Sequence, residues 1–128
     1  MDWAVSTPGG GVALNVTLDE SFLAWLRDRS SVPDVMIDPY RTTTIGGESQ
    51  VRWRDELKRI GAEHMAAVTS RLATRPGLPA DRTARERVVG TLVERELAAT
   101  PEWVTLGEAV AALELALELG GVIVARGD

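Results

Sequence analysis

The sequence predicts a mixed α/β fold in which a small four-stranded sheet is covered by helices, in the order β-β-α-β-α-α-α-β. Three observations favour this class. Apolar and polar residues alternate on both sides of a glycine-rich turn near the N-terminus, as in a β-hairpin. Apolar residues recur at spacings of three and four through the middle of the chain, as in amphipathic helices. A continuous apolar run follows two glycines near the C-terminus, as in an interior strand.

The size and composition fit one globular domain spanning residues 1–128. The chain has 45% hydrophobic and 26% charged residues, and a domain of this length folds without disulfides or metal. It has no cysteine, which excludes a thiolate metal site and a cysteine nucleophile. Basic residues are nearly all arginine, a bias that indicates a bacterial source. No secretion signal and no apolar run long enough to span a membrane are visible. The absence of cysteine fits a reducing compartment, so we expect a cytoplasmic protein.

The N-terminal hairpin is predicted from alternation in residues 3–6 and 12–16 about the turn at Pro8–Gly11. Its inward side chains are expected to be Val12, Leu14 and Val16. Thr17 then has a glutamate, Glu20, three residues on, which is the spacing of a capping box. We expect a helix of about thirteen residues to start there, with one apolar stripe formed by Leu18, Phe22, Trp25 and Leu26.

The third strand is predicted at residues 34–38 and is followed by a loop rich in threonine and glycine at residues 40–47. A long helix is expected from Glu48 towards Thr74, because apolar residues recur there at helical spacing. Its buried face is predicted to consist of Trp53, Leu57, Ile60, Val68 and Leu72.

Two further helices and a last strand are expected after the break at residues 75–79. One helix starts near Asp81 and turns Val88, Val89, Leu92, Val93 and Leu97 inward. Thr105 and Glu108 form a second capping box, which predicts a helix that ends at Gly120–Gly121. Residues 122–125 then form the interior strand.

No pattern of catalytic or metal-binding residues is recognisable, so we expect neither an enzyme nor a cofactor. His64 is the only histidine, and it lies on the apolar stripe of the long helix, where packing is the expected role. Gly9–Gly11 precede a strand, whereas phosphate-binding loops precede a helix. The basic residues near Trp53 alternate with acidic ones, and Arg52, Glu56, Arg59 and Glu63 are predicted to share one solvated helix face.

The net charge of −5 disfavours nucleic acid as a partner, because nonspecific nucleic-acid affinity rests on positive charge. The charge is uneven, since residues 41–79 are net basic and both flanking segments are net acidic. Such a distribution can steer a protein partner. We therefore expect a protein-binding function, with no membrane contact.

The segment around Asp38 is the most informative candidate site. It lies between a predicted strand and a helix, where α/β proteins present functional loops. Tyrosine and arginine are enriched at interface hot spots. The predicted partner-binding residues are Asp34, Asp38, Tyr40, Arg41, Glu48 and Arg52. The alternative is structural, with Asp38 capping the loop and Tyr40 packing its ring inward.

This segment also carries a resemblance. An apolar strand running into Asp-Pro-Tyr, here Ile37–Tyr40, is followed by Thr43, although Arg41 stands where the pattern has glycine. Further matching positions are Gln50, Glu56, Leu57, Gly121 and Gly127–Asp128. The pattern resembles small bacterial immunity-type proteins encoded beside polymorphic toxins. The resemblance implies an antitoxin-like protein that neutralises a toxin by direct occlusion.

Two other functions stay open. The helix after Thr105 is rich in alanine and leucine, so it is either central to the core or an interface of a self-associating module such as a homodimer. An enzyme that acts on an anionic substrate through Asp38, Tyr40 and Arg41 is a third hypothesis. The substitution Arg41→Ala distinguishes these hypotheses. An enzyme would lose its function and keep its binding, whereas in both binding hypotheses the two would be lost or kept together.

Overall fold

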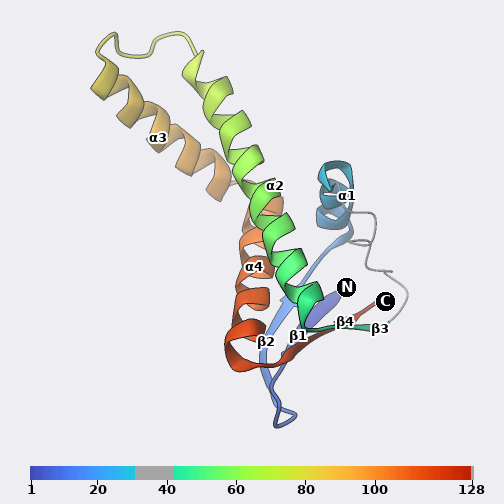
Figure 1. The fold of residues 1–128 in the computed structure, drawn as a ribbon. Helices are drawn as coiled ribbons and strands as arrows, with labels where there is room; N and C mark the ends of the chain where they lie inside the picture. Colours follow the sequence, from blue (N-terminus) through green and yellow to red (C-terminus); the bar gives the residue numbers. More distant parts are fainter. Residues whose placement is uncertain (31–41, 128) are drawn as a thin grey trace.

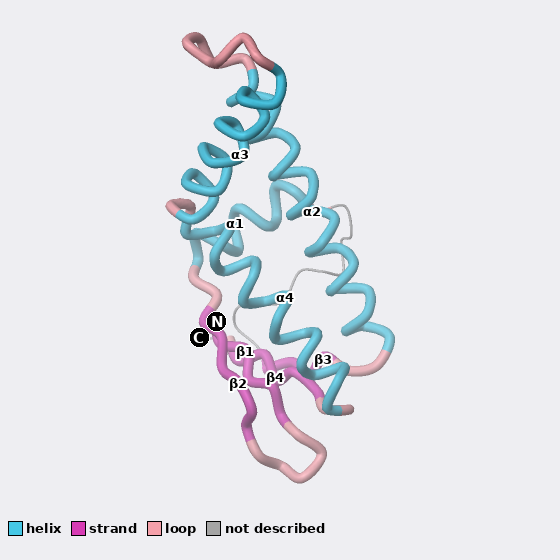
Figure 2. Tube along the Cα trace, turned by 90° about the vertical axis from the view of Figure 1, so that its left-hand side faces the viewer, coloured by secondary structure: helices cyan, strands magenta, loops and turns pink. Residues whose placement is uncertain are grey.

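The computed structural model describes residues 1–30 and 42–127. One antiparallel sheet of four strands, in the order β2-β1-β4-β3, lies on one side of the helices (Figures 1 and 2). The mixed α/β class and the predicted element order are confirmed. The elements are β1 Asp2–Ser6, β2 Val12–Thr17, α1 Glu20–Arg29, β3 Thr42–Ile45, α2 Glu48–Ala73, α3 Arg82–Ala98, α4 Pro101–Leu119 and β4 Val122–Arg126.

The β1–β2 hairpin forms as predicted, but one of its three expected inward residues is wrong. Val16 is buried opposite Trp3, and Leu14 is half-buried opposite Val5. Val12 is 65% exposed. The strand register shifts between Val5 and Ser6, and Val12 lies beyond this irregularity, at the end of the hairpin that the helices do not cover.

The predicted capping box at Thr17 is also wrong. Thr17 ends β2, and its hydroxyl donates to the Asp2 carboxylate at 2.9 Å. The N-cap of α1 is Asp19, whose carboxylate accepts from the Phe22 amide at 2.8 Å, and the helix has ten residues. Backbone pairing favours continuation of β2 over a helix start at Thr17. The Leu18 amide donates to the Met1 carbonyl at 2.7 Å, which keeps the chain extended to Leu18.

Residues 42–45, expected within a loop, form the edge strand β3. Three consecutive threonines precede Ile45, and β-branched side chains favour extended backbone. Ile45 is buried opposite Ile123 of β4, which anchors the strand to the core. The strand predicted at residues 34–38 lies outside the described residues.

Helix α2 begins and ends close to its predicted bounds, and all five of its predicted inward residues are buried. Helix α3 starts beside Asp81 as predicted, and the Asp81 side chain caps it, but Val88 is exposed rather than inward. Helix α4 starts at Pro101, four residues before the predicted capping box at Thr105. Proline suits the first helical position because its missing N–H would have no partner there.

Helix α4 is the centre of the molecule, which explains its alanine-rich composition. It contacts β1, β2, β4 and each of the other helices. Ala109, Ala112 and Ala116 are fully buried, and their small side chains let the helix lie close to its neighbours. Of the two interpretations of this helix, the core interpretation fits the structure.

A second, smaller core lies away from the sheet, where α2 and α3 project as a helical arm (Figure 1). We define the arm as the part of α2 from Met65 onward together with α3. Its buried residues are Val68, Leu72, Val89, Val93 and Leu97. Trp103 packs against both cores and joins the arm to the rest of the domain.

The turn from α4 into β4 requires glycine at residue 121. A Cβ atom added to Gly121 would lie 2.1 Å from the carbonyl oxygen of Ser6. Both groups are backbone in paired central strands, because Ser6 is opposite Val122. Neither can move without disturbing the sheet.

We therefore expect Gly121→Ala to lower the free energy of unfolding by about 2–3 kcal/mol, the cost of overpacking a site that cannot relax. Gly9→Ala is the matched control, because an added Cβ there meets nothing within 4 Å. It should change stability by less than about 0.5 kcal/mol. Urea unfolding measures both, and equal effects of the two substitutions would contradict the close contact.

Candidate interaction surface

The predicted partner-binding residues divide into two groups. Glu48 and Arg52 are exposed on the first two turns of α2, one helical turn apart. Asp34, Asp38, Tyr40 and Arg41 lie outside the described residues.

The surface beside Glu48 and Arg52 combines a helix face with a sheet edge. Val51 is an exposed apolar side chain next to them. β3 lies directly before this helix and is the last strand on its side of the described sheet. We call Thr42–Thr44 together with Glu48, Val51 and Arg52 the β3–α2 edge. It groups exposed apolar, positive and negative side chains of α2 with exposed residues of the strand that precedes α2 in the chain.

A buried amide holds this edge in place. The Gln50 side chain is 1% exposed, and its Nε2 donates at 2.9 Å to the carbonyls of both Ile45 and Gly121. One side chain therefore ties the end of β3 and the approach to β4 to the first turn of α2. Gly47 makes the connection possible, since its φ of 54° lies in the region that favours glycine.

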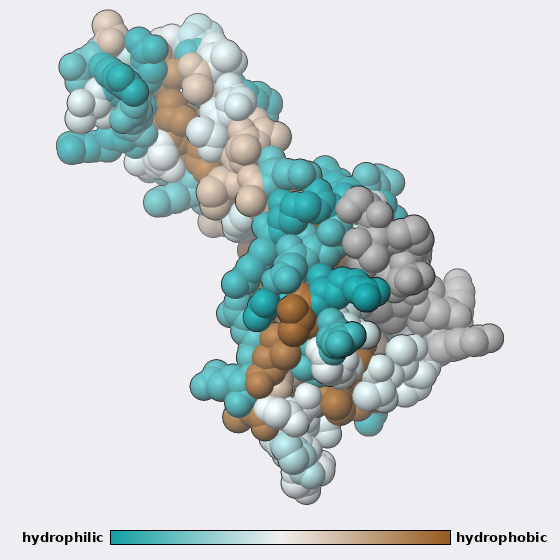
Figure 3. All heavy atoms as spheres, in the orientation of Figure 1, coloured by the Kyte–Doolittle hydropathy of each residue, from teal (hydrophilic) through white to brown (hydrophobic). Residues whose placement is uncertain are grey.

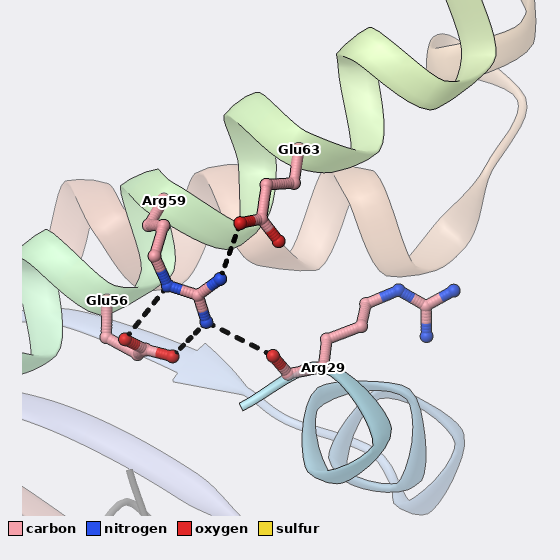
Figure 4. Close-up of polar contacts among 4 residues, drawn as sticks. All are labelled: Arg29, Glu56, Arg59 and Glu63. Carbon is pink, nitrogen blue, oxygen red and sulfur yellow. Dashed lines mark hydrogen bonds and ion pairs between the residues drawn. The ribbon is translucent and has the colours of Figure 1, made fainter. Parts of the chain in front are cut away.

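A second polar cluster docks α1 onto α2 (Figure 4). The Arg59 guanidinium donates to both oxygens of Glu56, to Glu63 at 2.9 Å and to the Arg29 carbonyl at 3.1 Å. That carbonyl belongs to the last residue of α1, where helix carbonyls lack partners within the helix. Hydrogen bonds from Arg59, first to Glu56 and then to Glu63, raise the pKa of the guanidinium above its ordinary value.

Glu56 was expected on a solvated face, and this expectation is wrong. Its side chain is 7% exposed, whereas that of Glu63, two turns further on, is 67% exposed. Charge alternation along the helix predicted the pairing with Arg59 but gave no signal for the neighbouring helix.

The His64 side chain of α2 packs between α1 and α4. Its ring lies edge-on to Trp25 of α1 at 5.5 Å and tilted against Trp103 of α4 at 5.9 Å. Burial is the main cause that lowers the pKa of His64, and the nearby positive charge of Arg29 adds to it. Glu96 and Glu102 act in the opposite direction. The neutral imidazole is therefore the form that the folded state favours.

Two adjoining apolar grooves follow α2 and share Met65. Apolar surface is visible between the two helices of the arm (Figure 3). The groove on the arm, about 470 Å³, lies between α2 and α3. Its lining residues are Met65, Thr69, Ala73, Arg85, Glu86, Val89, Gly90, Val93, Glu94 and Leu97. The second, about 400 Å³, lies between α2 and α4 and includes Gly61, Trp103 and Gly107. Sequence periodicity missed both grooves, although exposed Met65 and the glycines inside α3 and α4 were available signals.

No family model, curated protein or solved structure matches the chain. In the described part of the chain, no three histidine or acidic side chains gather as a metal site would require. None of its helices combines the length and apolarity needed to cross a membrane.

We expect Glu56→Gln to lower the free energy of unfolding by about 1–2 kcal/mol, because it weakens hydrogen bonds to a buried, charged acceptor. Glu63→Gln, at the exposed carboxylate on the same guanidinium, should cost less than about 0.5 kcal/mol. Denaturant titrations of the two variants make the comparison. An equal loss in both would show that burial of Glu56 does not matter.

Stability should also depend on His64 below neutral pH. The folded state lowers the pKa of His64, so the unfolded state binds more protons near its ordinary pKa of about 6.5. The free energy of unfolding should therefore fall as pH decreases through and below that value. His64→Phe keeps an aromatic ring and should give a flatter profile between about pH 7.5 and 5.5. Parallel profiles of the two proteins would rule out His64 as the source.

Proposed function

We propose that this protein binds another protein without catalysis, as an immunity- or antitoxin-like protein that neutralises a toxin by occluding it. The observation that carries the proposal is the β3–α2 edge. This surface directly follows the segment of the chain that bears the resemblance to immunity-type proteins. A toxin docked there would contact Glu48 and Arg52 and could extend the sheet along β3.

The place of β3 as the last strand on its side of the sheet, among the described residues, supports this mode of binding. Strand backbone groups that face outward can pair with an added strand, and neighbouring side chains then provide specificity. Thr42–Thr44 are exposed, while buried Ile45 keeps the strand in register with β4. Charges at the edge of such an interface raise the association rate and select the partner more than they raise affinity.

Several positions that carry the resemblance have structural roles, whereas the proposed contact residues are exposed. Gln50, Glu56 and Leu57 are buried, and Gly121 lies against the backbone of β1. Gln50 joins α2 to the end of β3 and to Gly121 before β4, and Glu56 binds Arg59 within α2. The proposed contact residues Glu48 and Arg52 lie on the exposed side of the same helix.

The test is a toxin-inhibition assay with the purified chain and the toxic proteins encoded by neighbouring genes. Inhibition of one of them by a stoichiometric complex is the expected result. Arg52→Glu reverses a charge on the β3–α2 edge and should weaken inhibition about tenfold, equivalent to about 1.4 kcal/mol. Arg75→Glu is the control, since it reverses an exposed charge at the far end of the arm.

Full activity of every neighbouring toxin in the presence of the chain would overturn the proposed function. Inhibition that Arg52→Glu leaves unchanged but Arg75→Glu removes would place the contact on the arm instead of the β3–α2 edge.

A further inference from the structure

We propose that the arm is a self-association surface, on which α3 of a second copy packs antiparallel across α3 of the first about a twofold axis near Gly90. This inference goes beyond toxin inhibition and does not depend on it. It concerns a different face from the β3–α2 edge.

The arm leaves an apolar face without cover among the described residues. Among the described elements, α2 and α4 make the main contacts with α3, and its buried side chains face them. The other side opens into the groove of about 470 Å³, whose apolar lining includes Val89, Val93 and Leu97. Met65 lies on the rim and is 43% exposed. A continuous apolar groove of this kind is typical of an interaction site.

Gly90 indicates how closely a partner helix approaches. Glycine inside a helix costs about 1 kcal/mol relative to alanine. An added Cβ at Gly90 would meet nothing within 4 Å, so no contact within the described chain requires glycine there. A helix crossing at this point does require it, because the distance between packed helices depends on the side chains at the contact.

The position of Gly90 favours a second copy as the occupant. Gly90 is the middle residue of α3, Arg82–Ala98. An antiparallel α3 that crosses there overlaps the whole helix, and a twofold axis brings the same residues together from both copies. An unrelated partner helix would not require the glycine at the midpoint.

The charges along α3 are complementary in this arrangement. The first half carries Arg82, Arg85 and Arg87 against one acid, and the first helical turn has no acidic residue. Positive charge at a helix N-terminus opposes the helix dipole. In an antiparallel pair, however, it lies beside the negative C-terminal half of the other copy. Arg85 and Glu94 both line the groove and flank Gly90 at five and four residues, so each faces the other across the axis.

The area is sufficient for a reversible dimer. Helix α3 has 17 residues and is therefore about 25 Å long. The α2 and α3 helices of one arm are together about 20 Å wide, so the face that a second copy covers on each arm is roughly 500 Å². The total of about 1,000 Å² is at the lower end of specific interfaces. We therefore expect dissociation in the micromolar range rather than an obligate dimer.

Sedimentation equilibrium of the full chain tests the proposal. The protein concentration is varied from about 1 µM to 1 mM, which brackets the micromolar dissociation constant expected for such an interface. The wild-type protein should change from monomer to dimer across this range. Gly90→Gln places a long side chain at the crossing and should weaken association at least tenfold. Its thermal stability at the lowest concentration should be unchanged or higher, because glutamine is a better helix former than glycine. Gly107→Gln, at the open glycine of the second groove, is the matched control and should dimerise like the wild type.

Charge reversal tests the antiparallel register. Arg85→Glu and Glu94→Arg should each weaken the dimer, and the double variant should restore it, because the pair is then exchanged across the axis. Since the chain lacks cysteine, Gly90→Cys should also form a disulfide-linked dimer on mild oxidation, while Gly107→Cys should not.

A wild-type chain that stays monomeric to 1 mM would overturn the proposal. So would a dimer that Gly90→Gln leaves intact, or one that Gly107→Gln disrupts instead. A dimer with no rescue in the double variant would overturn the antiparallel arrangement about Gly90.

Discussion

The fold depends on the junction where the Gln50 amide binds the ends of two strands. This side chain satisfies the carbonyls of Ile45 and Gly121 at one end of the sheet, and Gly121 itself lies against the carbonyl of Ser6. Three segments that are far apart in the sequence meet within a few atoms. Buried carbonyls that lose their donor cost free energy, so the amide constrains where α2 can start. The Gln50 side chain at this junction is buried, whereas the residues of the β3–α2 edge beside it are exposed.

The rest of the domain is arranged around α4. The small side chains of its buried alanines let the sheet pack closely against it. Trp103, in its first turn, packs against the core of the arm. The two cores are therefore unequal. The larger one is enclosed between sheet and helices, whereas the smaller one consists of a helical hairpin with an open groove. Where a domain has two cores of this kind, the thinner one is the natural place for a partner to complete the packing.

The element types could be predicted from the sequence because periodicity reports burial directly. Trp53, Leu57, Ile60, Val68 and Leu72 follow the helix repeat and are buried as expected. The errors occur where local signals compete with distant ones. The start of α4 is an exception, because Pro101 is a local signal that outweighs the cap spacing at Thr105. Thr17 has the spacing of a cap but is held in a strand by pairing with β1. Thr42–Thr44 became a strand because β4 lies beside them, and the Arg59 side chain that binds Glu56 also binds the end of α1. None of these neighbours is visible in local sequence.

The candidate site was predicted in part for the same reason. The exposure of Glu48 and Arg52 follows from their place on the helix, so sequence was sufficient for them. The grooves depend on how α2, α3 and α4 pack, and a pattern within one helix does not contain that information. Gly90 and Gly107 were the available clue, because a glycine that weakens a helix without filling a tight space needs an external explanation.

The order of the strands has a consequence for how the chain is made. β1 and β4 are neighbours at the centre of the sheet, yet they are the first and last elements of the described chain. During synthesis the N-terminal hairpin and the edge strand β3 must wait for β4, which leaves the ribosome after every helix. Contacts of such long sequence separation slow folding, and the waiting hairpin exposes apolar surface meanwhile. The sheet can therefore close only after β4 has been synthesised, which makes Val122–Arg126 decisive for whether the nascent chain folds or aggregates.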